Sequence, residues 1–165
     1  MKKLKLTLIA LALMILSVAV QASVVSFKKD NDGITCALDK GLMKVKICFD
    51  NMVEVKYTTL PVFLDKPSLV INNEWKITPG FTVTDNAKEI LIITSKLKVV
   101  VNKQTNSVKY TDLAGNVILA EDETQGKSMA EATIAGIDTY NCTSQFNSPA
   151  DEALYGLGCH PEDTL

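Results

Sequence analysis

The part of this 165-residue chain with the most distinctive chemistry is its end, from Asp151 to Leu165. It holds the only histidine, His160, and two glycines one residue apart, Gly156 and Gly158. Glycines at this spacing in a strand leave the backbone uncovered on one face, where a ligand can approach closely. The same pattern also fits a strand end or bulge without a ligand, and a histidine that is merely packed or exposed. Gly156 and Gly158 are therefore candidates for close contact with a ligand or with another backbone.

This segment offers no complete catalytic group. Neighbouring side chains on a strand point to opposite faces, so Asp151 and Glu152 cannot form the pair of carboxyl groups, about 5 to 5.5 Å apart, that cleaves a glycosidic bond with retention. For the same reason Cys159 projects away from His160, which argues against a cysteine–histidine pair. A single histidine without a Cys-x-x-Cys motif argues against a metal site. We expect no catalytic residue, no metal and no cofactor in this chain.

The run Glu152-Ala153-Leu154-Tyr155-Gly156-Leu157-Gly158, followed by His160, resembles a motif of glycoside hydrolase family 31, the α-glucosidases and α-xylosidases. In that family the motif lies on the substrate side and reads acidic, small, Leu or Ile, Tyr, Gly, Leu or Phe, Gly, then usually Glu or Gln, then often His. Cys159 stands here where the family usually has Glu or Gln, and Glu54 stands where it often has Arg. The resemblance extends over roughly Ser26 to Leu165, and it implies that Gly156, Gly158 and His160 belong to the substrate pocket of the complete enzyme.

The resemblance implies an all-β fold, the antiparallel, galactose-mutarotase-like β-sandwich found at the start of these enzymes. Their two catalytic aspartates belong to a (β/α)₈ barrel that follows the sandwich and takes about 250 residues. We therefore expect this chain to be inactive alone and its sandwich to be incomplete at the C-terminal end. Its partners would be the missing catalytic barrel and, through the complete enzyme, an oligosaccharide. That enzyme would hydrolyse terminal α-linked glucose or xylose by a double displacement, and this domain would help to shape its pocket.

Alternation of apolar and polar residues supports the β assignment independently of the resemblance. Two half-buried strands are predicted at 34–38 and 43–49, with the odd-numbered residues of the second directed into the core. A glycine-containing turn at 39–41 joins them, since glycine accepts positive φ without strain. This turn sets Cys36 opposite Met43.

Further strands are predicted in the second half of the chain. Residues 90–120 read as sequential antiparallel hairpins, and the apolar run 90–93 is typical of a strand covered on both faces. One or two more strands are expected around 132–134 and 140–146. The acidic run 121–123 between these regions indicates a solvated loop.

Residues 1–22 have the features of a secretory signal peptide, with cleavage before Ser23. Three lysines precede an apolar run from Leu6 to Val20, which is shorter than the roughly 20 residues of a membrane-spanning helix. Ala22 supplies the small residue at the cut. We expect export to the periplasm or beyond, no membrane contact after cleavage, and a single domain at 23–165.

The charge of the mature chain excludes some partners. Of the 17 basic residues, all lysines, three lie in the signal peptide, so 14 remain against 19 acidic residues, a net charge of −5. A mildly acidic chain without arginine or a basic stripe is not expected to bind nucleic acid or anionic lipid.

Four cysteines in an exported chain raise the question of disulfides. Cys36 and Cys48 lie on predicted neighbouring strands but are not expected to face each other. Cys142 and Cys159 are the better candidates for a pair. The redox state of all four stays open at this point.

A second function class also fits the composition, namely a free-standing exported carbohydrate-binding or adhesion module. Such a module needs exposed aromatic side chains grouped on one sheet face. The only tryptophan, Trp75, could stack on a sugar or fill the core. The four tyrosines and five phenylalanines are scattered along the chain, which favours the enzyme-domain interpretation.

Overall fold

The computed structural model describes residues 22–64, 79–124 and 126–153, and these residues form an all-β fold. The strands of the described residues are β1 (Val24–Asp30), β2 (Gly33–Leu38), β3 (Leu42–Phe49), β4 (Met52–Thr58), β5 (Thr82–Asp85), β6 (Glu89–Ile93), β7 (Lys98–Asn102), β8 (Val108–Thr111), β9 (Val117–Ala120), β10 (Lys127–Ile134) and β11 (Ile137–Ser144). Every neighbouring pair is antiparallel. The predicted fold class is thereby confirmed.

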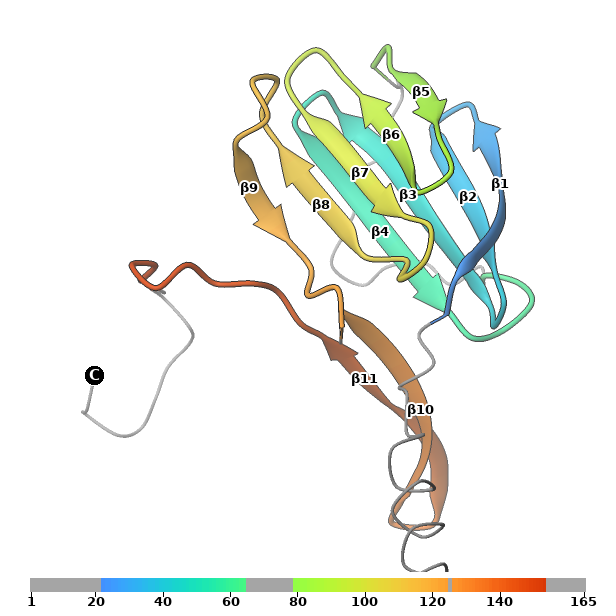
Figure 1. The fold of residues 1–165 in the computed structure, drawn as a ribbon. Helices are drawn as coiled ribbons and strands as arrows, with labels where there is room; N and C mark the ends of the chain where they lie inside the picture. The colour runs from blue at the N-terminus through green and yellow to red at the C-terminus, as the bar shows by residue number, and fades with distance from the viewer. Residues whose placement is uncertain (1–21, 65–78, 125, 154–165) are drawn as a thin grey trace, which may run out of the picture.

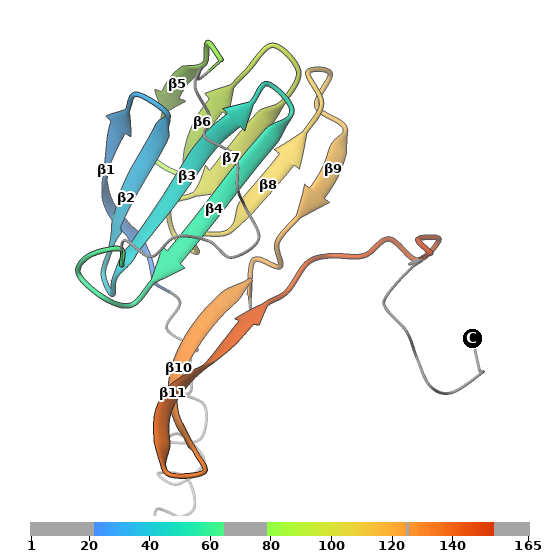
Figure 2. The same cartoon turned by 180° about the vertical axis from the view of Figure 1, so that it is seen from behind.

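Two sheets pack face to face as a sandwich, as Figures 1 and 2 show. One sheet has the order β1-β2-β3-β4 and the other the order β5-β6-β7-β8-β9. Alternate residues of both sheets point inward and form one core. Its buried members are Ile34, Cys36, Leu38, Met43, Val45, Ile47, Ile90, Ile92, Val99, Val101 and Val108.

The register between β2 and β3 agrees with the predicted turn, since Cys36 lies opposite Met43. The predicted alternation of 43–49 is wrong at its end. A register shift between Ile47 and Phe49 inserts an extra residue into β3. Cys48, expected to face outward, is consequently 3% exposed, and Phe49, expected to face inward, is 47% exposed. A bulge reverses the inside–outside assignment of every residue beyond it.

The strand predicted at 90–93 exists as β6, but it is not covered on both faces. Ile90 and Ile92 are fully buried, whereas Leu91 and Ile93 are half-buried. In an antiparallel sandwich each sheet turns only one face to the core, so a continuous apolar run there need not mean double coverage. The first strand, β1, is not predicted by the sequence analysis, because its residues beyond Phe27 are polar and mostly exposed.

The last two strands, β10 and β11, form a hairpin that extends away from the sandwich (Figure 2). Each has eight residues, which is longer than the strands predicted around 132–134 and 140–146. Most of their side chains are exposed. Their turn has positive φ at Ala135 (51°) and Gly136 (79°), the pattern of a type I′ turn.

Several predicted features fall outside the described residues. They are Trp75 and nearly all of the signal peptide, residues 1–21. Among the residues that are described, no helix is long and apolar enough to cross a membrane.

Candidate functional site

The residues predicted to line a substrate pocket, Gly156, Gly158 and His160, lie outside the described residues. The structure does show how the chain is held where it leaves β11. Phe146 forms an isolated antiparallel bridge with Glu121, at the end of the second sheet. On either side of this bridge the Asp122 amide donates to the Gln145 carbonyl at 3.0 Å, and the Asn147 amide donates to the Ala120 carbonyl at 2.9 Å. The chain that leaves β11 is thus anchored to the sandwich just before the predicted site.

A cavity of about 290 Å³ lies between the hairpin and the sandwich, and we call it the hairpin groove. Strands β4 and β8 of the sandwich contribute Val55, Tyr57 and Tyr110, and the isolated bridge contributes Glu121 and Phe146. The hairpin contributes Lys127, Ser128, Met129, Cys142, Thr143 and Ser144. It combines three aromatic rings with one buried pair of opposite charges. Such a surface can stack against an apolar face and exchange hydrogen bonds at its edges.

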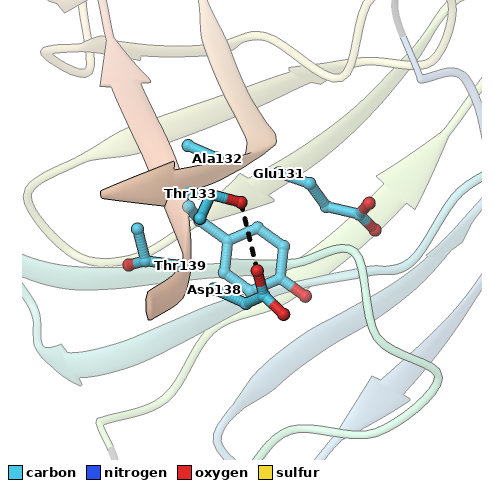
Figure 3. A pocket seen from close by; sticks show the side chains of 6 residues that line it. Glu131, Ala132, Thr133, Asp138 and Thr139 are labelled. Atoms are coloured by element: carbon cyan, nitrogen blue, oxygen red, sulfur yellow. Dashed lines mark hydrogen bonds between the residues drawn. The ribbon is translucent and has the colours of Figure 1, made fainter. Parts of the chain in front are cut away.

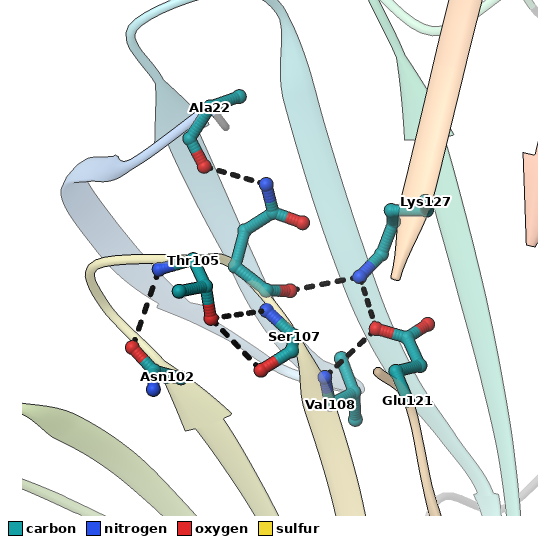
Figure 4. A network of polar contacts seen from close by, with 8 residues as sticks. Ala22, Asn102, Thr105, Ser107, Val108, Glu121 and Lys127 are labelled. Atoms are coloured by element: carbon teal, nitrogen blue, oxygen red, sulfur yellow. Dashed lines mark hydrogen bonds and ion pairs between the residues drawn. The ribbon is translucent and has the colours of Figure 1, made fainter. Parts of the chain in front are cut away.

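The charged pair at the inner end of the hairpin groove is Glu121 and Lys127. Their side chains are only 6% and 7% exposed, and the Lys127 ammonium donates to Glu121 Oε2. The same carboxylate oxygen accepts the Val108 amide at 2.8 Å, and Lys127 Nζ also donates to the Asn106 carbonyl at 2.8 Å. Figure 4 shows these contacts converging from three segments of the chain. The pair therefore joins the start of the hairpin to the sandwich.

This arrangement corrects the prediction that the acidic run 121–123 is a solvated loop. Its first member, Glu121, is buried, because the first amide of β8, that of Val108, and the ammonium of Lys127 both require an acceptor there. The sequence gives little indication of this burial. Lys127, six residues after Glu121, cannot be distinguished from a surface lysine until the hairpin folds back on the sandwich.

Burial changes the titration of the groove residues. It lowers the pKa of Lys127, while the neighbouring Glu121 charge opposes that change. Burial, aided by the charge of Glu121, raises the pKa of Tyr110 to about 12. Burial also raises the pKa of Tyr57. Both phenols therefore stay protonated at neutral pH, and they can donate hydrogen bonds but cannot act as general bases.

A second hollow, of about 500 Å³, lies near the outer end of the hairpin (Figure 3). It is lined by Glu131, Ala132, Thr133, Asp138, Thr139 and Tyr140. The Thr133 hydroxyl donates to Asp138 at 3.1 Å, a contact that Figure 3 marks. This hollow is open and polar, and fewer apolar side chains line it than line the hairpin groove.

The described cysteines fall into two environments. Cys36 and Cys48 are buried, and Cys142 is exposed on the hairpin. Burial raises the pKa of Cys36 to about 12 and also raises the pKa of Cys48. Cys159, the predicted partner of Cys142, lies outside the described residues, so that pairing stays a prediction.

Thiol labelling should separate these environments, because the thiolate is the reactive form. When the reduced native chain is treated with iodoacetamide at pH 8, we expect Cys142 to be alkylated and Cys36 and Cys48 to remain unmodified until urea is added. Peptide mass spectrometry identifies the labelled residues. Alkylation of native Cys36 as fast as Cys142 would contradict the buried placement.

Comparison with known proteins gives a consistent result. The family model described as the glycosyl hydrolase 31 N-terminal galactose mutarotase-like domain matches residues 42–164. Among solved structures, a GH31 α-xylosidase from Xanthomonas citri is similar to this chain, with a TM-score of 0.70 and 26% identity over 81% of the chain. A GH31 α-xylosidase from a soil metagenome, complexed with xylose, has a TM-score of 0.64 and 18% identity over 83% of the chain.

A GH31 dextranase from Flavobacterium johnsoniae, complexed with glucose, is also similar, with a TM-score of 0.60 and 14% identity over 66% of the chain. This chain spans only a small part of each of these proteins. It covers 15% of the Xanthomonas citri chain, 22% of the metagenomic chain and 14% of the dextranase.

Proposed function

Because this chain belongs to the glycosyl hydrolase 31 N-terminal galactose mutarotase-like domain family, we propose that it is the non-catalytic N-terminal domain of an exported α-glycosidase. The complete enzyme would hydrolyse terminal α-linked glucose or xylose from oligosaccharides. The catalytic carboxylates would come from the barrel that follows. This domain would help to shape the substrate pocket.

The family match carries this proposal. It includes Gly156, Gly158 and His160, the residues that resemble the substrate-side motif. The similarity to the Xanthomonas citri α-xylosidase, at 26% identity, supports xylose as one substrate. The uncovered backbone expected at two glycines would let a sugar, or a loop of the barrel, approach closely.

The anchored exit of the chain supports a role in shaping the pocket. The bridge between Glu121 and Phe146 fixes the direction in which the chain leaves the sandwich. The hairpin groove lies beside this bridge, and its phenols Tyr57 and Tyr110 stay protonated at neutral pH, because burial raises the pKa of both. A positioning role for the domain is consistent with that chemistry.

The alternative is a free-standing exported carbohydrate-binding or adhesion module. The exposed Tyr140 beside polar side chains at the outer hollow of the hairpin favours it, since an aromatic ring flanked by hydrogen-bonding groups suits a sugar. The two functions differ in what the isolated chain does.

Residues 23–165 should be tested for hydrolysis of p-nitrophenyl α-xyloside and α-glucoside, and titrated by calorimetry with α-xylosyl and α-glucosyl oligosaccharides. We expect neither hydrolysis nor saturable binding, because the barrel would supply most contacts to the sugar. Saturable binding by this chain alone would overturn the enzyme-domain proposal in favour of the binding module.

A further inference from the structure

Asn106, in the loop between β7 and β8, has an unusual environment. It is 3% exposed and adopts a left-handed conformation, with φ of 50°. Its side-chain Nδ2 donates to the Ala22 carbonyl at 2.5 Å, and its backbone carbonyl accepts Lys127 Nζ. Its side-chain Oδ1 is buried and has no hydrogen-bond partner. A buried acceptor without a donor is unfavourable, so a missing donor is indicated at this position.

The start of β1 is fixed against the same loop. The Val24 amide donates to the Lys103 carbonyl at 2.7 Å, and the Asp39 amide donates to the Ser23 carbonyl at 3.0 Å. These bonds lie on the carboxyl side of the peptide bond that joins Ala22 to Ser23. They hold Ser23 in place whether or not that bond is intact.

We infer that Asn106 is the docking site for the α-ammonium group that forms at Ser23 when the Ala22–Ser23 bond is hydrolysed. This inference rests on the proposed export of the chain, which supplies the cleavage. Water adds across the peptide bond: the Ala22 carbonyl leaves as a carboxylate with residues 1–22, and the Ser23 nitrogen becomes an ammonium group. The ammonium group donates to Asn106 Oδ1, which satisfies the unpartnered acceptor.

Covalent geometry places the groups near one another. The Ser23 nitrogen is bonded to the same carbon as the Ala22 oxygen, so the two atoms lie within about 2.5 Å of each other. In Asn106 the side-chain oxygen and nitrogen likewise share one carbon. The Ala22 oxygen contacts Nδ2 at 2.5 Å. Once residues 1–22 have left, rotation of the Asn106 amide about its Cβ–Cγ bond can present Oδ1 to the new ammonium group.

The neighbouring charges allow a cation here. Lys127 Nζ is engaged by Glu121 and the Asn106 carbonyl, and Lys103 Nζ is engaged by Asp85 at 2.7 Å. The backbone amide of Asp39 donates to the Ser23 carbonyl, so an acidic residue also lies next to Ser23. A neutral amide acceptor therefore receives the ammonium group, and the ammonium groups of Lys127 and Lys103 already have their own partners.

A double comparison tests the inference. Residues 23–165 are prepared with a free α-amine and with an α-N-acetyl group, whose carbonyl takes the place of the Ala22 carbonyl. Each form carries either Asn106 or Asn106→Asp, a substitution that keeps the shape and tolerates the left-handed conformation. The influence of Lys127 and Lys103 is common to both forms and cancels in the comparison.

In the acetylated chain, the carboxylate introduced by Asn106→Asp cannot donate to the acetyl carbonyl and repels it, so this substitution should lower the Tm by roughly 3–8 °C. In the free-amine chain at pH 6.5, the carboxylate accepts a hydrogen bond from the ammonium group. Asn106→Asp should therefore leave the Tm of this form unchanged or raise it. An equal loss of Tm in both forms would overturn the inference.

Mass spectrometry of the exported protein is the second measurement. An amino terminus at Ser23 supports the inference, and a terminus elsewhere overturns it by removing the group that docks. Neither result depends on sugar binding, so failure of this inference is distinguishable from failure of the proposed enzyme-domain function.

Discussion

Replacing Lys127 by methionine is expected to lower the free energy of unfolding by about 3–5 kcal/mol, the range for breaking a buried ion pair. Methionine keeps most of the side-chain volume but removes the ammonium group. The carboxylate of Glu121, 6% exposed, is then left buried without its cation. Urea unfolding followed by circular dichroism gives the free energy and shows whether the m-value is preserved.

The matched control is the double variant Glu121→Gln with Lys127→Met. A glutamine carbonyl can still accept the Val108 amide, which Glu121 accepts in the native chain at 2.8 Å. The double variant should therefore be more stable than Lys127→Met alone. If the single variant loses less than about 1 kcal/mol, the pair behaves like a surface salt bridge and its buried placement is contradicted.

Replacing Gly41 by alanine should cost about 3–5 kcal/mol, among the larger effects of a single substitution. Gly41 has a φ of 92°, and a Cβ there would lie 1.9 Å from the Thr58 carbonyl oxygen, a backbone atom. The turn between β2 and β3 and the end of β4 would have to separate. Thermal unfolding monitored by circular dichroism measures the loss.

Gly136 provides a control for the conformational part of this effect. Its φ of 79° is also left-handed, but a Cβ there would meet no atom within 4 Å. Gly136→Ala should cost only about 1–2 kcal/mol, the penalty of a left-handed alanine. Equal losses for the two variants would mean that the close approach at Gly41 does not matter.

The sequence predicts the strands whose alternation matches burial and misses those without such a signal. β2 and most of β3 alternate cleanly, and the opposition of Cys36 and Met43 follows from one turn. The bulge before Phe49 has no local marker, because an extra residue in a strand changes the register without changing the composition. β10 and β11 are mostly exposed, so periodicity could not give their full length.

The candidate site shows the same division. The sequence motif that contains Gly156, Gly158 and His160 identifies the family. The all-β fold class alone could not have identified it, because many families share one fold. The buried partnership of Glu121 and Lys127 depends on the hairpin folding back on the sandwich. Such a contact between separate elements leaves no spacing pattern in the sequence. The environment of Asn106 is equally hidden in the sequence. Its unpartnered oxygen is buried only because the loop between β7 and β8 packs against the start of β1.

The most direct test of the central proposal is to read the coding sequence in frame beyond the codon for Leu165. An N-terminal domain of an α-glycosidase predicts an open frame that continues with alternating strands and helices, about 250 residues for the barrel, and two aspartates at strand ends. A stop codon immediately after Leu165 would contradict that account, and glycan binding by the exported chain would then be the function to measure.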